Sequence, residues 1–427
     1  MPQANPFTPN RPIDPEYFAG RIEEVRKVLK ALTQTRHSKT QQILLTGERG
    51  IGKTSLAHYA RYLASDPNPT LKTDFQFAVA YYTVERNQTL ADVCRGLTSK
   101  LLDGIDKTLA TRCVDRLKTL RLHFHVDIPG VGEIGVADAA PKVSQAQLTA
   151  DFIMVLEKSW DDIHETKNGI LLVIDELHNL ARFDGVGSFF KVVSEGLAVD
   201  GYGQIMFMVI GSREISDKIS DDDRSAARIF SYVDLPRMTT IESRMIIDKC
   251  LSDSEKTITE DAANLIADRS GGIPYFLHQL GYDVFEVDTD NIIEDTDASK
   301  GLIASLIQFE RMTFGKLYKS VEGKQKQKIV DQLALGINVP QSAKQLEKST
   351  RIKSNIHQYL GSLQKDGIVE KSEGNYRLTS DLLSIYVSLF KMIPRNATNS
   401  LSSLKLAEAE DSSAHEKAAA SEDVDSK

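Results

Sequence analysis

Residues 47–54 read Gly-Glu-Arg-Gly-Ile-Gly-Lys-Thr and match the phosphate-loop pattern GxxxxGK[ST] at every fixed position. The apolar run 42–46 comes before this loop, and a helical pattern over 54–63 follows it. This is the strand, loop and helix order that such a loop requires. A glycine turn followed by a chance Lys-Thr pair is the alternative, and the flanking strand and helix argue against it. The loop therefore favours an α/β fold with a phosphate site behind its first strand.

Each residue type in this loop has a physical role toward a nucleotide. The glycines let the backbone turn its N–H groups toward the β-phosphate, and Lys53 adds a positive charge beside the β- and γ-phosphate oxygens. The Thr54 hydroxyl is available to Mg²⁺. The sequence therefore predicts bound ATP and Mg²⁺. The predicted nucleotide contacts in the loop are Gly47, Glu48, Arg49, Gly50, Ile51, Gly52, Lys53, Thr54 and Ser55.

A second apolar strand, 170–174, ends in the carboxylates Asp175 and Glu176. Because the run is apolar throughout, we expect the strand to be buried in a parallel sheet, which fixes the point where the carboxylates emerge. We predict that Asp175 holds the magnesium shell together with Thr54. Glu176 is predicted to polarise the attacking water, and Lys53 to stabilise the developing charge. Two acidic residues that only cap the next helix are the alternative.

A third apolar strand, 205–210, ends in Gly-Ser-Arg. A polar group there can reach the γ-phosphate from a neighbouring strand, so Ser212 and Arg213 are predicted to join the catalytic residues. An ordinary strand-end salt bridge is the alternative for Arg213. Further on, Arg224 and Arg228 follow an acidic run. Either is a candidate arginine finger toward a neighbouring subunit, and local charge pairing is the alternative for both.

The remaining pattern predicts several domains. Apolar strands separated by helices indicate a doubly wound α/β domain with a parallel sheet, and its expected strands are 42–46, 75–84, 170–174, 205–210 and 232–235. A glycine-rich stretch at 130–135 matches GxGxxG, but no apolar helix follows it, which favours a hairpin turn over a dinucleotide site. The predicted order is an extended proline-rich arm over 1–16, a P-loop ATPase domain over 17–236 with an inserted hairpin region 104–150, a helical lid over 237–320, a winged helix-turn-helix over 321–395 and a disordered tail over 396–427.

The predicted winged helix carries a local excess of positive charge. Residues 321–395 contain 12 Lys and Arg against 7 Asp and Glu, although the whole chain has a net charge of −8. Its side chains expected to face outward are Arg351, Lys353, Asn355, His357, Lys365, Lys371 and Arg377. This set suits contact with the phosphates and a groove of double-stranded DNA. Winged helices also dock proteins, so a protein partner stays open.

With these segments in place, the chain resembles the AAA+ and STAND-like P-loop ATPases of the origin-recognition type. In that family an Orc-like ATPase domain is followed by a winged helix, and the resemblance covers about residues 18–390. The residues that carry it are Asn5-Pro6-Phe7, Ala19-Gly20-Arg21, the loop 47–55, Ile174-Asp175-Glu176, Gly211-Ser212-Arg213, Gly272-Ile273-Pro274 and Asn375-Tyr376-Arg377-Leu378. The resemblance implies an AAA+-like P-loop NTPase fold with a helical lid.

The resemblance also implies roles outside the phosphate loop. In this family the segment before the first helix borders the adenine, which makes Phe18, Gly20 and Arg21 expected nucleotide neighbours. The polar residue at the strand end, here Ser212, corresponds to sensor 1. AAA+ initiators usually place a sensor 2 arginine at the start of a lid helix. This chain has Gly-Ile-Pro-Tyr there, closer to the GxP pattern of STAND signalling ATPases. That departure implies slow hydrolysis, with Pro274 packed near the base.

The sequence thus predicts an ATP-dependent molecular switch whose lid reorients the winged helix toward DNA or a partner. The alternative is a STAND-like regulatory or defence-signalling scaffold that holds nucleotide, self-associates or binds proteins, and acts without DNA. A small-molecule kinase is a weaker option, because the lid and the winged helix leave no evident acceptor site. No apolar run approaches the roughly 20 residues that cross a bilayer, and no signal pattern opens the sequence, so we expect a cytoplasmic protein without membrane contact.

Overall fold

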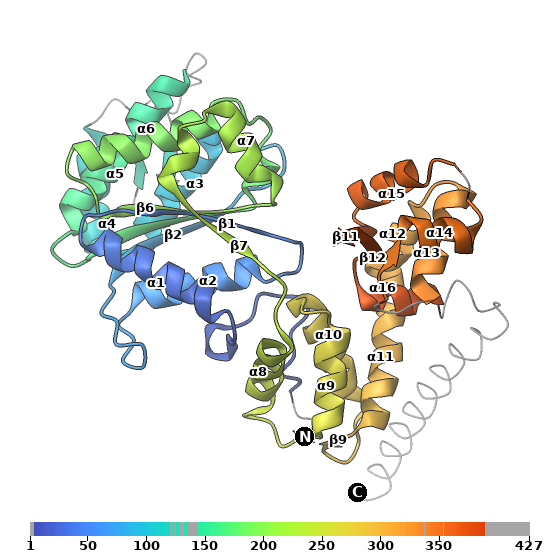
Figure 1. Ribbon diagram of the computed structural model, residues 1–427. Helices are drawn as coiled ribbons and strands as arrows, with labels where there is room; N and C mark the ends of the chain where they lie inside the picture. Colours follow the sequence, from blue (N-terminus) through green and yellow to red (C-terminus); the bar gives the residue numbers. More distant parts are fainter. Residues whose placement is uncertain are drawn as a thin grey trace, which may run out of the picture. The chain divides into compact units, whose positions relative to one another are not determined.

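The structure is a computed structural model that describes residues 4–119, 122, 125–128, 132–134, 144–335, 339–352 and 354–388. It divides into two compact units (Figure 1). The first unit comprises residues 1–255 and 272–279, and the second comprises 256–271 and 280–427. The predicted domain boundary after residue 236 falls inside the first unit, so the segment predicted as a lid contributes to both units.

The first unit is built on a five-stranded sheet in which all four strand pairs are parallel (Figure 1). The strand order across the sheet is β2, β5, β6, β1, β7. The bounds are β1 (Gln42–Gly47), β2 (Phe77–Thr83), β5 (Gly169–Asp175), β6 (Ile205–Ile210) and β7 (Phe230–Leu235). Every residue of β1, β5 and β6 is buried, because each of these apolar strands has a strand on both sides and helices on both faces. The predicted α/β fold with a parallel sheet is confirmed.

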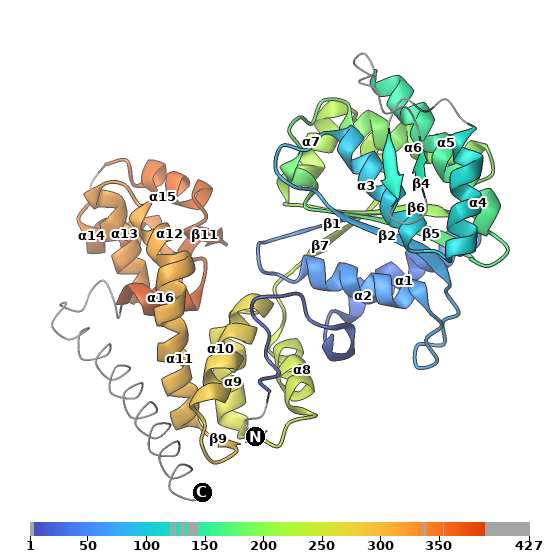
Figure 2. The same cartoon turned by 180° about the vertical axis from the view of Figure 1, so that it is seen from behind.

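Helices cover both faces of this sheet (Figure 1 and Figure 2). α1 and α2 lie on one face, and α3, α5, α6 and α7 lie on the other. The bounds are η1 (Pro15–Tyr17), α1 (Ile22–Arg36), α2 (Lys53–Ser65), α3 (Leu90–Asp103), α5 (Gln145–Ile163), η2 (Leu177–Asn179), α6 (Val186–Val199), α7 (Glu214–Asp222), η3 (Ala226–Ile229) and α8 (Thr240–Leu251). Among the helices of the described residues, none has both the length and the apolar character to cross a membrane.

The region predicted as an inserted hairpin contains more than a hairpin. β3 (Val126–Ile128) pairs antiparallel with β4 (Gly132–Ile134), and a helix, α4 (Lys107–Lys118), comes before them. The buried residues of α4 recur at helical spacing, so the signal for this helix is present in the sequence: Ala110, Cys113, Val114 and Leu117. Residues 130, 131 and 135 of the GxGxxG stretch lie outside the described residues, and the other three form β4.

The second unit begins with helices and one short strand pair. β8 (Thr257–Ile258) pairs in parallel with β9 (Ile292–Ile293), a pairing that the sequence did not predict. Beside it, Lys256 Nζ and Asp288 Oδ2 form a buried ion pair of 2.7 Å. α10 begins in the first unit and continues into the second. The helices of this part of the chain are α9 (Glu260–Arg269), α10 (Pro274–Val287), α11 (Asp295–Phe309), a π-helical turn (Glu310–Phe314) and α12 (Gly315–Lys319).

The C-terminal part of the second unit combines four helices with a three-stranded antiparallel sheet of order β10, β12, β11. The bounds are α13 (Lys324–Leu335), β10 (Gln341–Ser342), α14 (Ala343–Thr350), α15 (Ile356–Lys365), β11 (Val369–Ser372), β12 (Asn375–Leu378) and α16 (Asp381–Tyr386). Buried Leu346, Leu360 and Leu363 pack the helices together. The winged-helix interpretation stays a prediction, and Lys353 and the tail 396–427 lie outside the described residues.

Candidate nucleotide-binding site

The phosphate loop connects β1 to α2, and three glycines set its backbone shape. Gly47, Gly50 and Gly52 have φ values of 148°, 79° and 96°, a region in which other residues are strained. A Cβ atom at Gly47 would also lie only 3.2 Å from the backbone oxygen of Leu235. The loop leads into the N-terminus of α2 at Lys53, where free backbone N–H groups and the helix dipole favour an anion.

The Lys53 ammonium lies over the loop. Its Nζ donates hydrogen bonds to the carbonyl oxygens of Gly47 at 2.9 Å and Glu48 at 2.8 Å. Burial lowers the pKa of Lys53, while the negative charges of Glu176 and Asp175 act in the opposite direction. A phosphate in the loop would offer oxygens to the same ammonium, which is the electrostatic role that the sequence predicts for this residue.

Asp175, at the end of β5, is 2% exposed and receives hydrogen bonds on both carboxylate oxygens. Its Oδ2 accepts from Thr54 Oγ1 at 2.9 Å and from Tyr81 Oη at 2.7 Å. Its Oδ1 accepts from the backbone N–H of Glu176 at 2.8 Å. Magnesium prefers hard oxygen ligands, so the carboxylate and the Thr54 hydroxyl fit the predicted metal site. Bound Mg²⁺ would neutralise charge on the phosphates.

Glu176 follows directly, in a left-handed backbone conformation with φ of 59°. This conformation is uncommon for a residue with a side chain, and such residues cluster at functional sites. Glu176 Oε2 lies 3.1 Å from His178 Nε2, and both side chains line the same cavity as Lys53. A carboxylate is therefore positioned beside the phosphate loop, where a water-polarising base is predicted.

The strand order of the sheet places Ser212 between the phosphate loop and the Asp175–Glu176 pair. β6 lies between β1 and β5, and Ser212 follows it after one residue. Because the carboxyl ends of parallel strands meet at one edge, the polar residue after β6 lies between the phosphate loop and Asp175. Ser212 lines the cavity, as a predicted γ-phosphate neighbour must.

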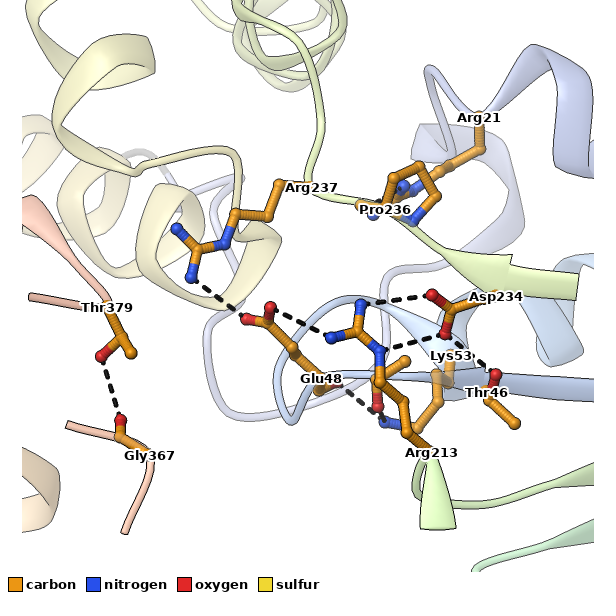
Figure 3. A network of polar contacts seen from close by, with 11 residues as sticks. Arg21, Thr46, Glu48, Lys53, Arg213, Asp234, Pro236, Arg237, Gly367 and Thr379 are labelled. Atoms are coloured by element: carbon orange, nitrogen blue, oxygen red, sulfur yellow. Dashed lines mark hydrogen bonds and ion pairs between the residues drawn. The ribbon is translucent and has the colours of Figure 1, made fainter. Parts of the chain in front are cut away.

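Arg213 is held by two carboxylates (Figure 3). Its Nη2 lies 3.2 Å from Asp234 Oδ2, and its Nη1 lies 3.7 Å from Glu48 Oε1 of the phosphate loop. Hydrogen bonding to Asp234 is the main reason that the pKa of Arg213 is raised. Arg237 Nη2 approaches the second oxygen of Glu48 at 3.4 Å. Asp234 in turn accepts a hydrogen bond of 2.9 Å from Thr46. The strand-end salt bridge named as the alternative is thus present, and it is joined to the loop.

A cavity of about 620 Å³, a size typical of small-molecule sites, is lined by the phosphate loop, Glu176 and Ser212, whereas Glu48, Asp175 and Arg213 are not among its lining residues. It lies within the first unit. The following residues line the cavity and were predicted from the sequence as site residues: Phe18, Arg21, Gly47, Arg49, Gly50, Ile51, Gly52, Lys53, Thr54, Ser55, Glu176, Ser212 and Pro274. Lining residues that the sequence did not predict include Ile13, Arg86, His178, Asn179, Met238, Ile246, Tyr275 and His278. They come from segments that are far apart in the chain, so no local sequence pattern predicts that they line this cavity.

The N-terminal arm forms part of this cavity. Phe7 is 2% exposed and packs edge-on against His278, with ring centroids 6.1 Å apart. The backbone N–H of Thr8 donates to His278 Nδ1 at 3.3 Å, and that of Ile13 donates to Ser55 Oγ at 3.4 Å. The arm was predicted to run over a surface; its proline content indicated the extended backbone but not this attachment.

The three residues expected near the base take different positions. Phe18 lines the cavity and stacks on Tyr59, with ring centroids 4.4 Å apart. Arg21 is 4% exposed, and its guanidinium donates to the carbonyl oxygens of Ile51 at 2.9 Å and Pro236. Gly20 leaves room for the side chain of Met238, which a Cβ atom would meet at 2.6 Å. Arg21 and Gly20 therefore also connect the first helix to the loop and to the segment after β7.

The Gly-Ile-Pro-Tyr segment packs against the phosphate loop. The backbone N–H of Tyr275 donates to the carbonyl of Gly50 at 3.2 Å. Pro274 Cγ lies 3.6 Å from the position of a Cβ at Gly52. Pro274 thus borders the phosphate end of the cavity, although the resemblance implied a position near the base.

The two arginine-finger candidates are both exposed. Arg228 lies in η3, two residues before β7 and at the amino end of the strands, and it lines a separate hollow with Lys30 and Lys39. This is the edge of the sheet opposite the phosphate loop, so Arg228 does not serve the site of its own chain. Arg224 lies between α7 and η3.

We expect the buried His278 to make folding sensitive to acid. Burial lowers its pKa to about 4, whereas an unfolded histidine has a pKa of roughly 6.5. The neutral ring is therefore favoured by folding, and its contribution, complete above about pH 6.5, is lost as the pH falls toward 4. Urea unfolding at pH 7 and pH 4.5 should show wild type losing about 2–3 kcal/mol more than His278→Asn. Parallel losses in both proteins would contradict this expectation.

Comparison with known proteins finds a similarity for part of the first unit. Residues 17–185 match the model of the AAA ATPase domain family. No match is found among the curated proteins.

Two of the solved structures that resemble this chain share its fold over most of its length. One is a Walker-type ATPase of Pyrococcus abyssi, with 14% identity, a TM-score of 0.52, and coverage of 87% of this chain and 96% of the other. The other is the Orc2 protein of Aeropyrum pernix, with 14% identity, a TM-score of 0.53, and coverage of 87% and 94%. At this identity the likeness establishes a shared fold. The chain therefore shares the fold of these two structures, and its residues 17–185 are similar to the AAA ATPase domain family.

Proposed function

We propose that this protein is a slow ATPase that works as a switch, and that it couples its nucleotide state to DNA or partner binding by residues 321–395. The observation that carries the proposal is the meeting of three strand ends at one cavity. The phosphate loop follows β1. Asp175 is the last residue of β5 and Glu176 comes next, and Ser212 lies two residues after β6. Phosphoryl transfer requires positioning and charge stabilisation, and these groups supply both.

In the proposed reaction the loop and Lys53 hold the β- and γ-phosphates, and Thr54 and Asp175 hold Mg²⁺. Glu176 accepts a proton from a water that attacks the γ-phosphorus, the bond to the ADP oxygen breaks, and ADP and inorganic phosphate leave. Slow turnover is supported by the start of α10, which is Pro-Tyr-Phe with no arginine. An adenine nucleotide is supported by the A. pernix Orc2 protein of similar fold, whose complexes contain ADPNP and ADP.

Arg213 is the group proposed to report the γ-phosphate. It is shared between Asp234 on β7 and Glu48 in the phosphate loop, which also contacts Arg237 (Figure 3). A γ-phosphate would compete with these carboxylates for the guanidinium, whereas ADP lacks that competitor. ATP and ADP would therefore leave different ion pairs around Glu48, and this difference supplies the energy for a switch.

We expect Glu48→Gln to raise the ratio of ATP affinity to ADP affinity about threefold, since partly exposed ion pairs contribute about 0.2–1 kcal/mol. Arg213→Gln should lower the same ratio. Fluorescent-nucleotide titrations of both variants measure it. Arg26→Gln, which removes an exposed ion pair with Glu23 on α1, is the matched control. Equal changes for ATP and ADP in both variants would show that these ion pairs do not report the γ-phosphate.

DNA is the proposed partner of the C-terminal helices because of their charge and exposure. Arg351, Asn355, His357, Lys365 and Lys371 are exposed. Basic side chains at the start of α15, along it and after it suit contacts with the phosphate backbone of duplex DNA. Arg377 is less suited than predicted, because its Nε donates to Glu370 across the β11–β12 pair at 2.5 Å.

ATP turnover with and without duplex DNA, measured beside Glu176→Gln, tests this proposal. Stimulation by DNA that Glu176→Gln abolishes would support it. Tight nucleotide binding without turnover and without a DNA effect would favour the second candidate, a signalling scaffold that acts through protein contacts. That candidate is supported by the packing of Pro274 and Tyr275 on the phosphate loop, which connects nucleotide contact to α10 without an arginine.

A further inference from the structure

The buried carboxylate of Asp175 has a hydrogen-bond donor that belongs to neither the phosphate loop nor the cavity lining. Tyr81 lies on β2, beside β5, in register with Val173. Side chains alternate along a strand, so Tyr81 shares a sheet face with Asp175 and is its diagonal neighbour, within reach of an aromatic ring. The Tyr81 hydroxyl closes that distance and donates to Asp175 Oδ2 at 2.7 Å.

The Tyr81 hydroxyl is fixed as a donor. A carboxylate offers only acceptor oxygens, so the hydroxyl points its hydrogen toward Asp175 Oδ2. A carboxylate with 2% exposure has little contact with water, so neighbouring donors must satisfy its oxygens. Tyr81 is therefore one of the groups that orient Asp175.

The ring of Tyr81 is itself held in place by α2. His58 stacks on it, with ring centroids 4.7 Å apart and an interplanar angle of 10°. His58 lies four residues after Thr54, so both project from the same face of the helix. Thr54 donates to the same Oδ2 atom that accepts from Tyr81. One face of α2 thus contacts Asp175 directly through Thr54 and indirectly through His58 and Tyr81.

We propose that Tyr81 is a positioning residue for magnesium, which acts by orienting Asp175 and leaves nucleotide contact to the loop. The inference rests on the proposed ATPase site. If Mg²⁺ took the Thr54 hydroxyl as a ligand, Tyr81 would remain as a donor to the shared carboxylate oxygen. Hydrogen-bond partners of metal-binding carboxylates commonly change metal affinity by about 10–100-fold when removed.

Titration of Mg²⁺ against ATP turnover in Tyr81→Phe tests this role. The half-saturating Mg²⁺ concentration should rise about 10-fold, while turnover at saturating Mg²⁺ stays within about twofold of wild type. ATP binding in EDTA should be unchanged, because the loop contacts remain. A loss that saturating Mg²⁺ does not recover, or an unchanged Mg²⁺ midpoint, would overturn the inference.

The neighbouring Tyr82 provides a matched control. It lies on the same strand but faces the other way, and its hydroxyl donates to Gln88 at 2.9 Å. Tyr82→Phe removes one partly buried phenol oxygen without touching Asp175, so its Mg²⁺ midpoint should equal that of wild type. An equal shift in both variants would mean a general effect on β2 and would overturn the specific role of Tyr81.

Two further variants complete the test. In an Asp175→Asn background Tyr81→Phe should have no additional effect on Mg²⁺-dependent ATP binding, because its target is already changed. If Tyr81→Phe fails to fold, His58→Ala replaces it, with a shift of about threefold expected in the same direction; no shift would overturn the inference. A wild-type protein without any Mg²⁺ dependence would overturn the proposed function as well, whereas a dependence lost in Asp175→Asn but unmoved by Tyr81→Phe would overturn the inference alone.

Discussion

Lys53→Ala is expected to weaken ATP binding about 10- to 150-fold, the effect of losing hydrogen bonds to a charged group worth about 1.5–3 kcal/mol. In the structure the Lys53 ammonium lies within 2.9 Å of two loop carbonyls, at the position where a phosphate in the loop would take over the contact. Alanine also leaves the loop backbone in place, because the glycines and not the lysine set its shape. Isothermal titration with ATP and Mg²⁺ measures the loss.

Substitution of a surface lysine shows whether the loss of ATP affinity is specific to Lys53. Lys158→Ala on α5 removes a partly exposed ammonium that pairs with Asp161 at 3.3 Å and lies outside the cavity lining. This variant should bind ATP as wild type does. If Lys53→Ala retains full affinity, the cavity is not a site for nucleotide phosphates and the proposed function fails.

Glu176→Gln is expected to reduce ATP turnover about 10²- to 10⁴-fold, the usual contribution of a general base. ATP affinity should change by less than about twofold, because the amide keeps the size of the side chain while losing the charge that accepts a proton. Glutamine has the same shape as glutamate, so we expect the left-handed backbone at residue 176 to be unchanged in this variant. Single-turnover and steady-state phosphate release measure the rate, and nucleotide titration measures the affinity.

An exposed glutamate on the same domain serves as the control for this substitution. Glu165→Gln changes an exposed carboxylate beyond the end of α5 and should leave turnover unchanged. If Glu176→Gln turns over ATP at the wild-type rate, another group activates the water. Equal loss of affinity and rate would instead indicate that Glu176 contributes to binding.

The parts of the site that could be predicted are the ones written in consecutive residues. The phosphate loop needs glycines, Lys53 and Thr54 at fixed spacing, and the apolar run before Asp175 predicts where that carboxylate emerges. The same holds for Ser212 at the end of a third apolar strand. These positions follow from local pattern together with the rule that parallel strands end at one edge.

The parts that could not be predicted depend on distant segments coming together. Tyr81 reaches Asp175 only because β2 pairs with β5 in one particular register, with 94 positions between the two residues. His278 meets the arm across 270 positions. The place of Arg213 after a strand follows from the local pattern, but Glu48 as its partner depends on how the loop folds back. α4 is a different case, since the helical spacing of its apolar residues is present in the sequence.

The attachment of the arm affects the rate of nucleotide exchange rather than the nucleotide affinity. Phe7 is inserted beside His278, and Thr8, Pro9, Arg11, Pro12 and Ile13 form part of the wall of the cavity. A nucleotide enclosed partly by this segment exchanges at a rate that includes detachment of the arm, a local opening that leaves the sheet intact. The lifetime of each nucleotide state would then be set by one aromatic side chain outside the phosphate loop.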